Sequence, residues 1–239
     1  MKQVFYTVWT LSSFTLVTSF FAFAAVVVGL IDRTGRTVNM CAREWARVLL
    51  TLNGVRLNIH GHEHVSGNRS YIFMANHQSA LDIPVLFAAL PFQLRMMAKK
   101  ELFRIPVFGW ALSLGGYIRV DRENRERAIA SLQQAAKRVQ RQRVSVVVFP
   151  EGTRSGSGQL GTFKKGGFMF ALDTGYPVVP VTLDGARDRT PNRQLIITPG
   201  EVDVYIGKPI SVTKYTRATR DELIARTAHG INKHLNGGI

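Results

Sequence analysis

Asn76-His77-Gln78-Ser79-Ala80-Leu81-Asp82 lies between two apolar runs, residues 71–75 and 83–87. Polar residues in such a position are typical of a strand end, a tight connection and a helix start. His77 and Asp82 would lie about 140° apart on a regular helix, so a turn must bring them together. If His77 leaves the strand and Asp82 begins the helix, the carboxylate can bond one imidazole nitrogen. The other nitrogen could then accept a proton from a hydroxyl group.

The same residues also have a purely structural interpretation. Asp82, ahead of Ile83 and Pro84, is a good helix N-cap with proline in the first turn. Ser79 could cap the helix equally well, and His77 could simply serve the turn. The choice between the two interpretations depends on the rest of the chain.

The residues beyond the amino terminus favour an α/β fold. Short apolar runs predict strands, and amphipathic stretches between several of them predict helices, the clearest from about residue 123 to residue 142. Thr219 and Glu222 predict a capping box at the start of a last helix. This alternation is typical of a mixed, largely parallel sheet flanked by helices. The predicted strands are residues 55–59, 71–75, 94–98, 117–120, 144–149, 178–182, 195–198 and 202–206.

The amino terminus has the composition of a membrane segment. Residues 4–31 carry no charge, and a helix of 28 residues is about 42 Å long, which exceeds the hydrocarbon thickness of a bilayer. A cleaved signal peptide is the alternative, because Ala22-Phe23-Ala24 resembles a cleavage site, but the apolar run is too long for one. We therefore expect residues 1–53 to form membrane-anchoring helices and residues 54–239 to form the α/β domain. Whether the first helix spans or re-enters the membrane stays open.

The second anchoring helix is expected to be amphipathic. One face of this helix, at helical spacing, would carry Cys41, Trp45, Val48, Leu49 and Leu52. The opposite, solvent-facing side would carry arginine and glutamate. Basic residues that follow the first helix place the downstream domain on the cytoplasmic side.

The composition narrows the possible ligands. The chain has 31 basic and 16 acidic residues, a formal charge of +15, which favours anionic partners such as phosphorylated substrates, anionic lipid or nucleic acid. A single cysteine, Cys41, excludes an internal disulfide and a site of paired thiolates. His60, His62 and His64 alternate after an apolar run, where a polar edge strand is a simpler interpretation than a metal site.

A second polar segment follows the most apolar predicted strand. In Phe149-Pro150-Glu151-Gly152-Thr153-Arg154-Ser155, glycine permits close backbone approach and Arg154 offers a fork for a phosphate. Lys164 and Lys165 then add charge before a predicted helix start. A solvated turn is the alternative.

Two more cations fall at predicted strand ends. Lys100 follows one strand and Arg122 follows another, so both are expected at the same sheet edge as His77 and Arg154. A histidine, its acidic partner and several cations at one edge would suit a phosphate-bearing substrate with a neighbouring hydroxyl. Taken singly, each cation could be an ordinary surface residue.

These segments carry a resemblance to a known family. The chain resembles the bacterial glycerolipid acyltransferases, in particular the 1-acyl-sn-glycerol-3-phosphate (lysophosphatidate) acyltransferases, over about residues 55–210. The family's motifs appear in order: His77 to Asp82, residues 116–122, residues 149–155 and residues 176–181. The chain departs from the pattern at Arg119, where the family more usually has an apolar residue.

The resemblance implies a reaction and roles for the residues. The reaction is transfer of a fatty acyl group from acyl-CoA or acyl-carrier protein to the sn-2 hydroxyl of lysophosphatidate, which gives phosphatidate and needs no metal or organic cofactor. His77 would be the general base and Asp82 its partner. The remaining site residues would be the phosphate ligands Lys100, Arg122 and Arg154, and the acceptor-pocket residues Glu151, Gly152 and Thr153.

The resemblance also implies partners and a cellular location, and it leaves alternative functions open. The partners would be membrane lipid and the acyl donor, at a bacterial inner membrane, with no nucleic acid. Another acceptor is the nearest alternative: a different lysophospholipid, a lyso-ornithine lipid or glycerol 3-phosphate. A thioester hydrolase, a basic nucleic-acid-binding protein and a catalytically silent membrane scaffold are weaker alternatives, and no nucleic-acid recognition motif is present.

Overall fold

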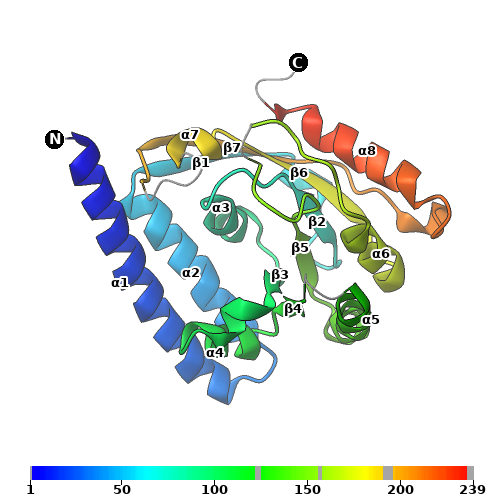
Figure 1. Cartoon of the computed structure of the whole chain (residues 1–239), viewed down its shortest axis with the longest axis horizontal. Helices are drawn as coiled ribbons and strands as arrows, with labels where there is room; N and C mark the ends of the chain where they lie inside the picture. Colours follow the sequence, from blue (N-terminus) through cyan, green and yellow to red (C-terminus); the bar gives the residue numbers. More distant parts are fainter. Residues whose placement is uncertain (1, 122–124, 156–157, 191–195, 236–239) are drawn as a thin grey trace.

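The computed structural model describes residues 2–121, 125–155, 158–190 and 196–235. It begins with a hairpin of two helices, α1 (Lys2–Ile31) and α2 (Arg36–Leu52). The turn between them is organised by Asp32, whose carboxylate accepts hydrogen bonds from the backbone N–H groups of Thr34 (2.8 Å) and Thr37 (2.9 Å). The hairpin lies along one side of the α/β domain (Figure 1).

The described residues of the domain form a seven-stranded sheet in the order β1-β7-β6-β2-β5-β3-β4. Every neighbouring pair in it is parallel except β6 and β7, which are antiparallel. The predicted mixed, largely parallel sheet is therefore confirmed. The strands are β1 (Val55–His60), β2 (Ile72–Ala75), β3 (Leu94–Lys99), β4 (Ile118–Val120), β5 (Ser145–Val148), β6 (Val178–Asp184) and β7 (Gly200–Ile206).

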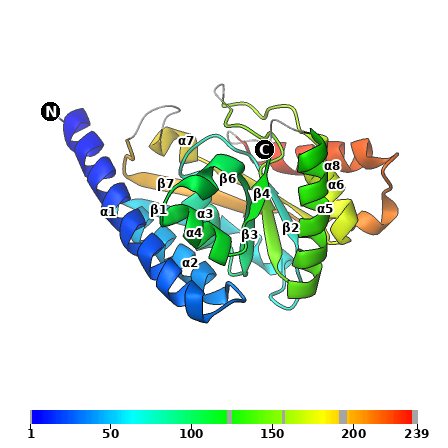
Figure 2. The same cartoon turned by 60° about the horizontal axis from the view of Figure 1, so that its bottom comes forward.

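Helices cover both faces of the sheet (Figures 1 and 2). The helices of the domain are α3 (Asp82–Ala89), α4 (Phe108–Leu114), α5 (Arg125–Gln142), α6 (Lys165–Thr174), α7 (Ala186–Arg189) and α8 (Arg220–Asn232), with short 3-10 turns at η1 (His62–His64), η2 (Lys100–Arg104) and η3 (Val212–Lys214).

The central strands alternate between two apolar cores. Phe73 of β2 and Val147 of β5 pack in the core on the α2 and α3 side. Ile72 of β2 and Val146 of β5 pack in the core on the side of α5, α6 and α8. Because β2 and β5 are buried on both faces, they are continuous apolar runs, and their polar ends emerge together at one edge.

Two local predictions were wrong. Residues 196–198 are not a strand, because the N–H groups of Ile197 and Thr198 bond Thr10 of α1 and Arg189 instead of a neighbouring strand. Residue 195 lies outside the described part of the chain. The side chain of Thr219 does not cap α8, since its hydroxyl accepts from Thr216.

The faces of α2 and the end of β1 also differ from expectation. Val48 and Leu52 are exposed, whereas Arg43 is half-buried and donates to the carbonyl groups of Leu90 and Phe92. Helix α2 thus packs on the domain through a polar contact that the hydrophobic pattern does not show. The edge strand ends at His60, and the 3-10 turn that follows breaks the predicted alternation of histidines.

Candidate active site

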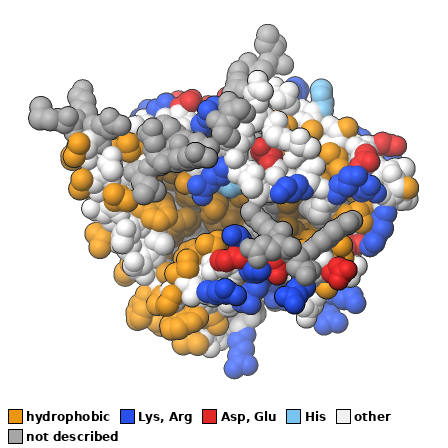
Figure 3. Space-filling view, viewed as in Figure 1, with side chains coloured by type: hydrophobic (Ala, Val, Ile, Leu, Met, Phe, Trp, Pro, Cys, Tyr) orange, Lys and Arg blue, Asp and Glu red, His pale blue; other side chains and the backbone are white. Residues whose placement is uncertain are grey.

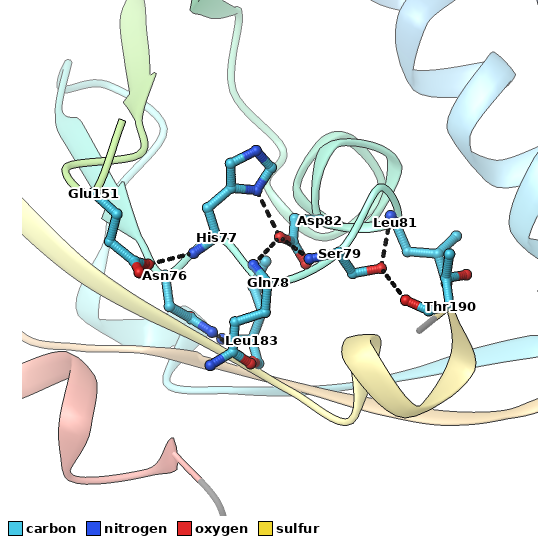
Figure 4. Close-up of polar contacts among 9 residues, drawn as sticks. All are labelled: Asn76, His77, Gln78, Ser79, Leu81, Asp82, Glu151, Leu183 and Thr190. Carbon is cyan, nitrogen blue, oxygen red and sulfur yellow. Dashed lines mark hydrogen bonds and ion pairs between the residues drawn. The ribbon is translucent and has the colours of Figure 1, made fainter. Parts of the chain in front are cut away.

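His77 and Asp82 meet in the connection between β2 and α3. His77 Nδ1 lies 2.7 Å from Asp82 Oδ2, and the Asp82 side chain is fully buried. Phe149, at the end of β5, stacks on the imidazole with ring centroids 4.0 Å apart. The second ring nitrogen lies on the side away from Asp82 (Figure 4). One nitrogen is thus held by the carboxylate while the other can meet a substrate.

The turn itself explains why Asp82 occupies this position. Asp82 Oδ2 also accepts the backbone N–H groups of Gln78 (2.7 Å) and Ser79 (2.8 Å) (Figure 4). The carboxylate therefore folds the turn around itself and does not cap α3, which has Leu81 as its N-cap residue. Hydrogen bonds to ionised oxygens are strong, so the imidazole partner is fixed by the backbone.

Asn76 ties the same turn to the sheet. Its side-chain amide donates to the carbonyl of Leu183 (2.9 Å) and accepts from the N–H of Leu183 (2.8 Å). Asn76 is fully buried, and Leu183 belongs to β6, the strand beside β2. The exit of β2 is thereby fixed where the ladder of backbone hydrogen bonds ends.

Glu151 holds the turn from the other side. Its carboxylate accepts the N–H of His77 (2.8 Å) and the N–H of Gly161 (2.9 Å). Burial raises the pKa of the Glu151 carboxyl, and these two hydrogen bonds oppose the rise. A Cβ atom at position 161 would lie 2.7 Å from Glu151 Oε2, so glycine is required for this approach. Glu151 shapes the site through the backbone of His77 and of the following loop.

A cavity of about 870 Å³ reaches His77. Much of its wall is apolar and comes from elements far apart in the sequence: α1, α2, β3, α4 and α5. Thr18, Phe21, Ala22 and Ala25 of α1 are part of that wall. Trp45 of α2 lines it too and donates from Nε1 to Thr18 Oγ1 (3.0 Å), which joins the two helices. Figure 3 shows a hollow with an apolar wall on this face of the molecule.

Cations gather at the polar end of the same cavity. Lys99, Arg154 and Lys164 line it, together with Gly152 and Thr153. Gly152 has a φ of 74°, a left-handed backbone conformation that favours glycine, and the end of the Lys164 side chain lies beside it. Gly166 and Gly167, at the start of α6, also line the cavity. The arrangement offers an anion several donors next to His77.

Two predicted phosphate ligands need separate comment. Lys100 Nζ lies 3.0 Å from Asp121 Oδ1, and Asp121 lines the cavity. Arg122 lies outside the described residues. The roles predicted for both stay predictions. Arg119, the departure from the family pattern, is exposed and lies over the Phe103 ring, whereas its neighbour Val120 lines the cavity.

Two features of the site had no clear signal in the sequence. The stacking of Phe149 on His77 depends on the pairing of β2 with β5, which no local pattern specifies. The contribution of α1 to the cavity was also missed, because an uncharged helix near the amino terminus indicates only contact with lipid. A small residue in it, such as Ala22, gives no hint that it faces a cavity.

Comparison with known proteins agrees with this geometry. Residues 56–184 match the family model described as acyltransferase. The chain is 34% identical to a 1-acyl-sn-glycerol-3-phosphate acyltransferase of Cocos nucifera, over 73% of this chain but only 56% of that one. It is 32% identical to the alpha form of that acyltransferase from Mus musculus, over 90% of this chain and 73% of the mouse protein.

A solved structure extends the similarity to the whole fold. The crystal structure of the 1-acyl-sn-glycerophosphate (LPA) acyltransferase from Thermotoga maritima matches with a TM-score of 0.78 at 25% identity, and the match covers 96% of this chain and 97% of that one. The chain spans about half the length of the coconut relative, so the shared part is the acyltransferase fold. The chain belongs to the acyltransferase family represented by the 1-acyl-sn-glycerol-3-phosphate acyltransferases.

Proposed function

We propose that the chain transfers a fatty acyl group from acyl-CoA or acyl-carrier protein to the sn-2 hydroxyl of 1-acyl-glycerol-3-phosphate, giving phosphatidate. The observation that carries the proposal is the His77–Asp82 pair at the junction of an apolar cavity and a cationic rim. The names of the relatives support the same acceptor. The proposed reaction draws on no metal or organic cofactor.

In the proposed reaction His77 is the general base. Its second ring nitrogen takes the proton of the sn-2 hydroxyl as the oxygen attacks the thioester carbonyl carbon. Asp82 fixes the tautomer and stabilises the imidazolium that forms. When the tetrahedral intermediate collapses, the carbon–sulfur bond breaks and His77 returns the proton to the leaving thiolate. An ester replaces the thioester, and no acyl-enzyme is formed.

The two ends of the cavity would hold the two ends of the acceptor. Arg154 and Lys164 are the described cavity residues best suited to a phosphate, through charge-assisted hydrogen bonds. Lys100 and Arg122 are proposed to assist them. The apolar wall formed by α1, α2 and α4 has the chemistry and the volume to hold a fatty acyl chain.

Helix α1 is proposed to attach the domain to the bacterial inner membrane from its cytoplasmic side. Among the described residues it is the one helix long and apolar enough to cross a bilayer. It is also held to the domain near both ends: Ile197 N donates to Thr10 Oγ1 (2.8 Å), and Thr34 O, beyond the last turn of α1, accepts from Arg95. A helix held in this way would lie in the leaflet next to the domain and return to the same side of the membrane without crossing the bilayer.

An acceptor panel tests the proposed function. The full chain in mixed micelles is given one radiolabelled acyl-CoA and, separately, lysophosphatidate, glycerol 3-phosphate, a lyso-ornithine lipid or lysophosphatidylethanolamine, and acyl-carrier protein replaces CoA in a second series. We expect labelled phosphatidate with lysophosphatidate. Preferred labelling of another acceptor would establish the alternative acyltransferase, and release of free fatty acid without acceptor would indicate a hydrolase.

A further inference from the structure

The segment from η2 to α4 exposes three large apolar side chains, of which Leu102 also lines the cavity and the other two do not. Leu102, Ile105 and Trp110 are 38%, 47% and 58% exposed. We call these three residues the apolar corner. Scattered apolar residues are common on protein surfaces, but three in nine positions, one of them tryptophan, form a local patch.

The backbone of this segment is tightly constrained. Gly109 N bonds Ile105 O (2.7 Å), and a Cβ atom at position 109 would lie 2.3 Å from Phe103 O. Val107 has a φ of 62°, an uncommon conformation for a β-branched residue. Helix α4 is therefore folded back on η2, and this fold presents the apolar corner as a fixed shape.

The apolar corner continues the exposed apolar face of α1. Helix α4 packs beside the carboxyl-terminal half of α1 (Figures 1 and 2). Ala111 of α4 and Ala25 of α1 belong to one buried cluster. In the same half of α1, Phe23 and Leu30 are 64% and 68% exposed. Hydrophobic side chains gather over α1 and α4 on the face shown in Figure 3.

Cations flank the apolar corner. Arg104 and Arg119 are both exposed, and the Arg119 guanidinium lies 4.6 Å from the centre of the Phe103 ring. Ile118 is buried and Val120 lines the cavity, so Arg119 extends from the opposite face of β4. Apolar and aromatic residues bordered by arginine match the boundary between acyl chains and anionic headgroups.

We propose that the apolar corner is a second lipid-contacting element, which inserts at the headgroup boundary of an anionic bilayer while Arg104 and Arg119 bind lipid phosphates. The proposal rests on the proposed membrane attachment through α1. Phe108 of α4 and Phe21 of α1 line the same cavity. Lipid contact on both helices therefore places the cavity against the bilayer, where a lipid acceptor resides.

Depth measurements on the full chain test this proposal without using turnover. In a Cys41→Ser background, single cysteines replace Trp110, Ile105, Phe20 on α1 or Ala225 on α8, and each carries a nitrobenzoxadiazole label. The protein is reconstituted in phosphatidylcholine vesicles with phosphatidylglycerol, with or without doxyl-labelled lipid. Ala225 is the matched control, because it is exposed and lies on α8, far from α4.

We expect the labels at positions 20, 105 and 110 to lose emission to the doxyl lipid, whereas the label at 225 is unaffected. Quenching at 20 but not at 105 and 110 would overturn the proposal and leave the attachment through α1 intact. No quenching at any position would overturn the proposal together with the membrane attachment on which it rests.

A charge comparison tests the headgroup contact. We expect quenching at 110 to rise with the phosphatidylglycerol fraction, and Arg104→Gln with Arg119→Gln to remove that rise. Arg141→Gln with Arg226→Gln, both exposed and outside the α4 region, should keep it. In pure phosphatidylcholine the proteins should behave alike. A rise that survives the first pair of substitutions would show that these arginines do not bind the headgroups.

Discussion

Asp82 does two things at once in this fold, because one carboxylate oxygen closes a turn of the backbone and holds the histidine ring. A residue that only closed the turn would leave the imidazole without its carboxylate partner. The carboxylate needs no separate orienting group, since backbone N–H groups fix it. The sequence pattern alone could not separate this arrangement from a helix cap, because both use an aspartate at the start of α3.

Arg154 should act on acceptor binding more than on chemistry. It is exposed at the rim of the cavity and belongs to the loop after β5. Arg154→Ala removes a charge-assisted contact to phosphate, at a cost on the order of 1.5–3 kcal/mol, which is roughly a 10- to 150-fold rise in the KM for lysophosphatidate. Steady-state kinetics at varied acceptor measures it, with Arg141→Ala as the exposed control. An unchanged acceptor KM would count against the phosphate contact.

Glu151 should make stability depend on pH in a defined direction. Burial raises its pKa in the folded protein above the ordinary value of 4.5, so the folded state binds the proton more tightly than the unfolded state does. The stabilising contribution of the protonated carboxyl is present below that ordinary value and is lost as the pH rises through the raised one. Glu151→Gln cannot titrate and should not show this loss.

Urea denaturation of both proteins in detergent, between about pH 4 and pH 7, checks the expectation. As the pH rises, the unfolding free energy of the wild type should fall relative to that of Glu151→Gln. A difference that stays constant, or that moves in favour of the wild type, would contradict the raised pKa.

Among the helices, α1 has a role that its composition does not reveal. Ala22 lines the cavity, whereas Ala24, two residues away and similarly half-buried, does not. Ala22→Phe should fill part of the space for the acyl chain and shift the preference toward shorter chains, and Ala24→Phe should leave it unchanged. Competition among lysophosphatidate acceptors of different acyl-chain length measures the shift. The same chain-length profile in both variants would show that α1 does not bound the chain.

Periodicity predicted most of the strands, because buried strands are apolar runs with turn residues at their ends. It failed where a tertiary contact took the backbone hydrogen bonds. Ile197 has the residue type of a strand, but its N–H bonds the Thr10 hydroxyl of α1. Likewise Arg43 has the residue type of a solvent-exposed helix face, but its guanidinium donates hydrogen bonds to two carbonyl groups of the domain. Neither partner can be inferred from a local window of sequence.

The attachment of the whole chain to a membrane can be tested by the positions of its two ends. Because Trp9 bonds Leu52 and Thr10 bonds Ile197, the amino-terminal half of α1 is held beside the domain. Epitope tags at the amino and carboxyl termini should therefore both be protected in intact spheroplasts and both be cleaved in inside-out vesicles. Tags on opposite sides would mean that α1 crosses the bilayer and leaves the domain.

The site as a whole was predictable to the extent that parallel strands dictate it. His77 and Arg154 each follow a strand, and because β2 and β5 are parallel neighbours their ends meet at one edge. The apolar part of the cavity was not predictable, since it needs α1, α2 and α4 to pack together across a wide sequence separation. Chemistry at strand ends follows from topology, whereas the shape of a cavity follows from packing.

The central claim is that His77 takes the acceptor proton at this edge, and the most direct test is the rate of phosphatidate formation. The initial rate with lysophosphatidate and labelled acyl-CoA is compared for wild type, His77→Ala and His229→Ala, an exposed histidine on α8. We expect His77→Ala to lose about 10²–10⁴-fold or more in rate with an unchanged circular dichroism spectrum, and His229→Ala to match the wild type. Near-normal turnover by a folded His77→Ala protein would contradict the claim.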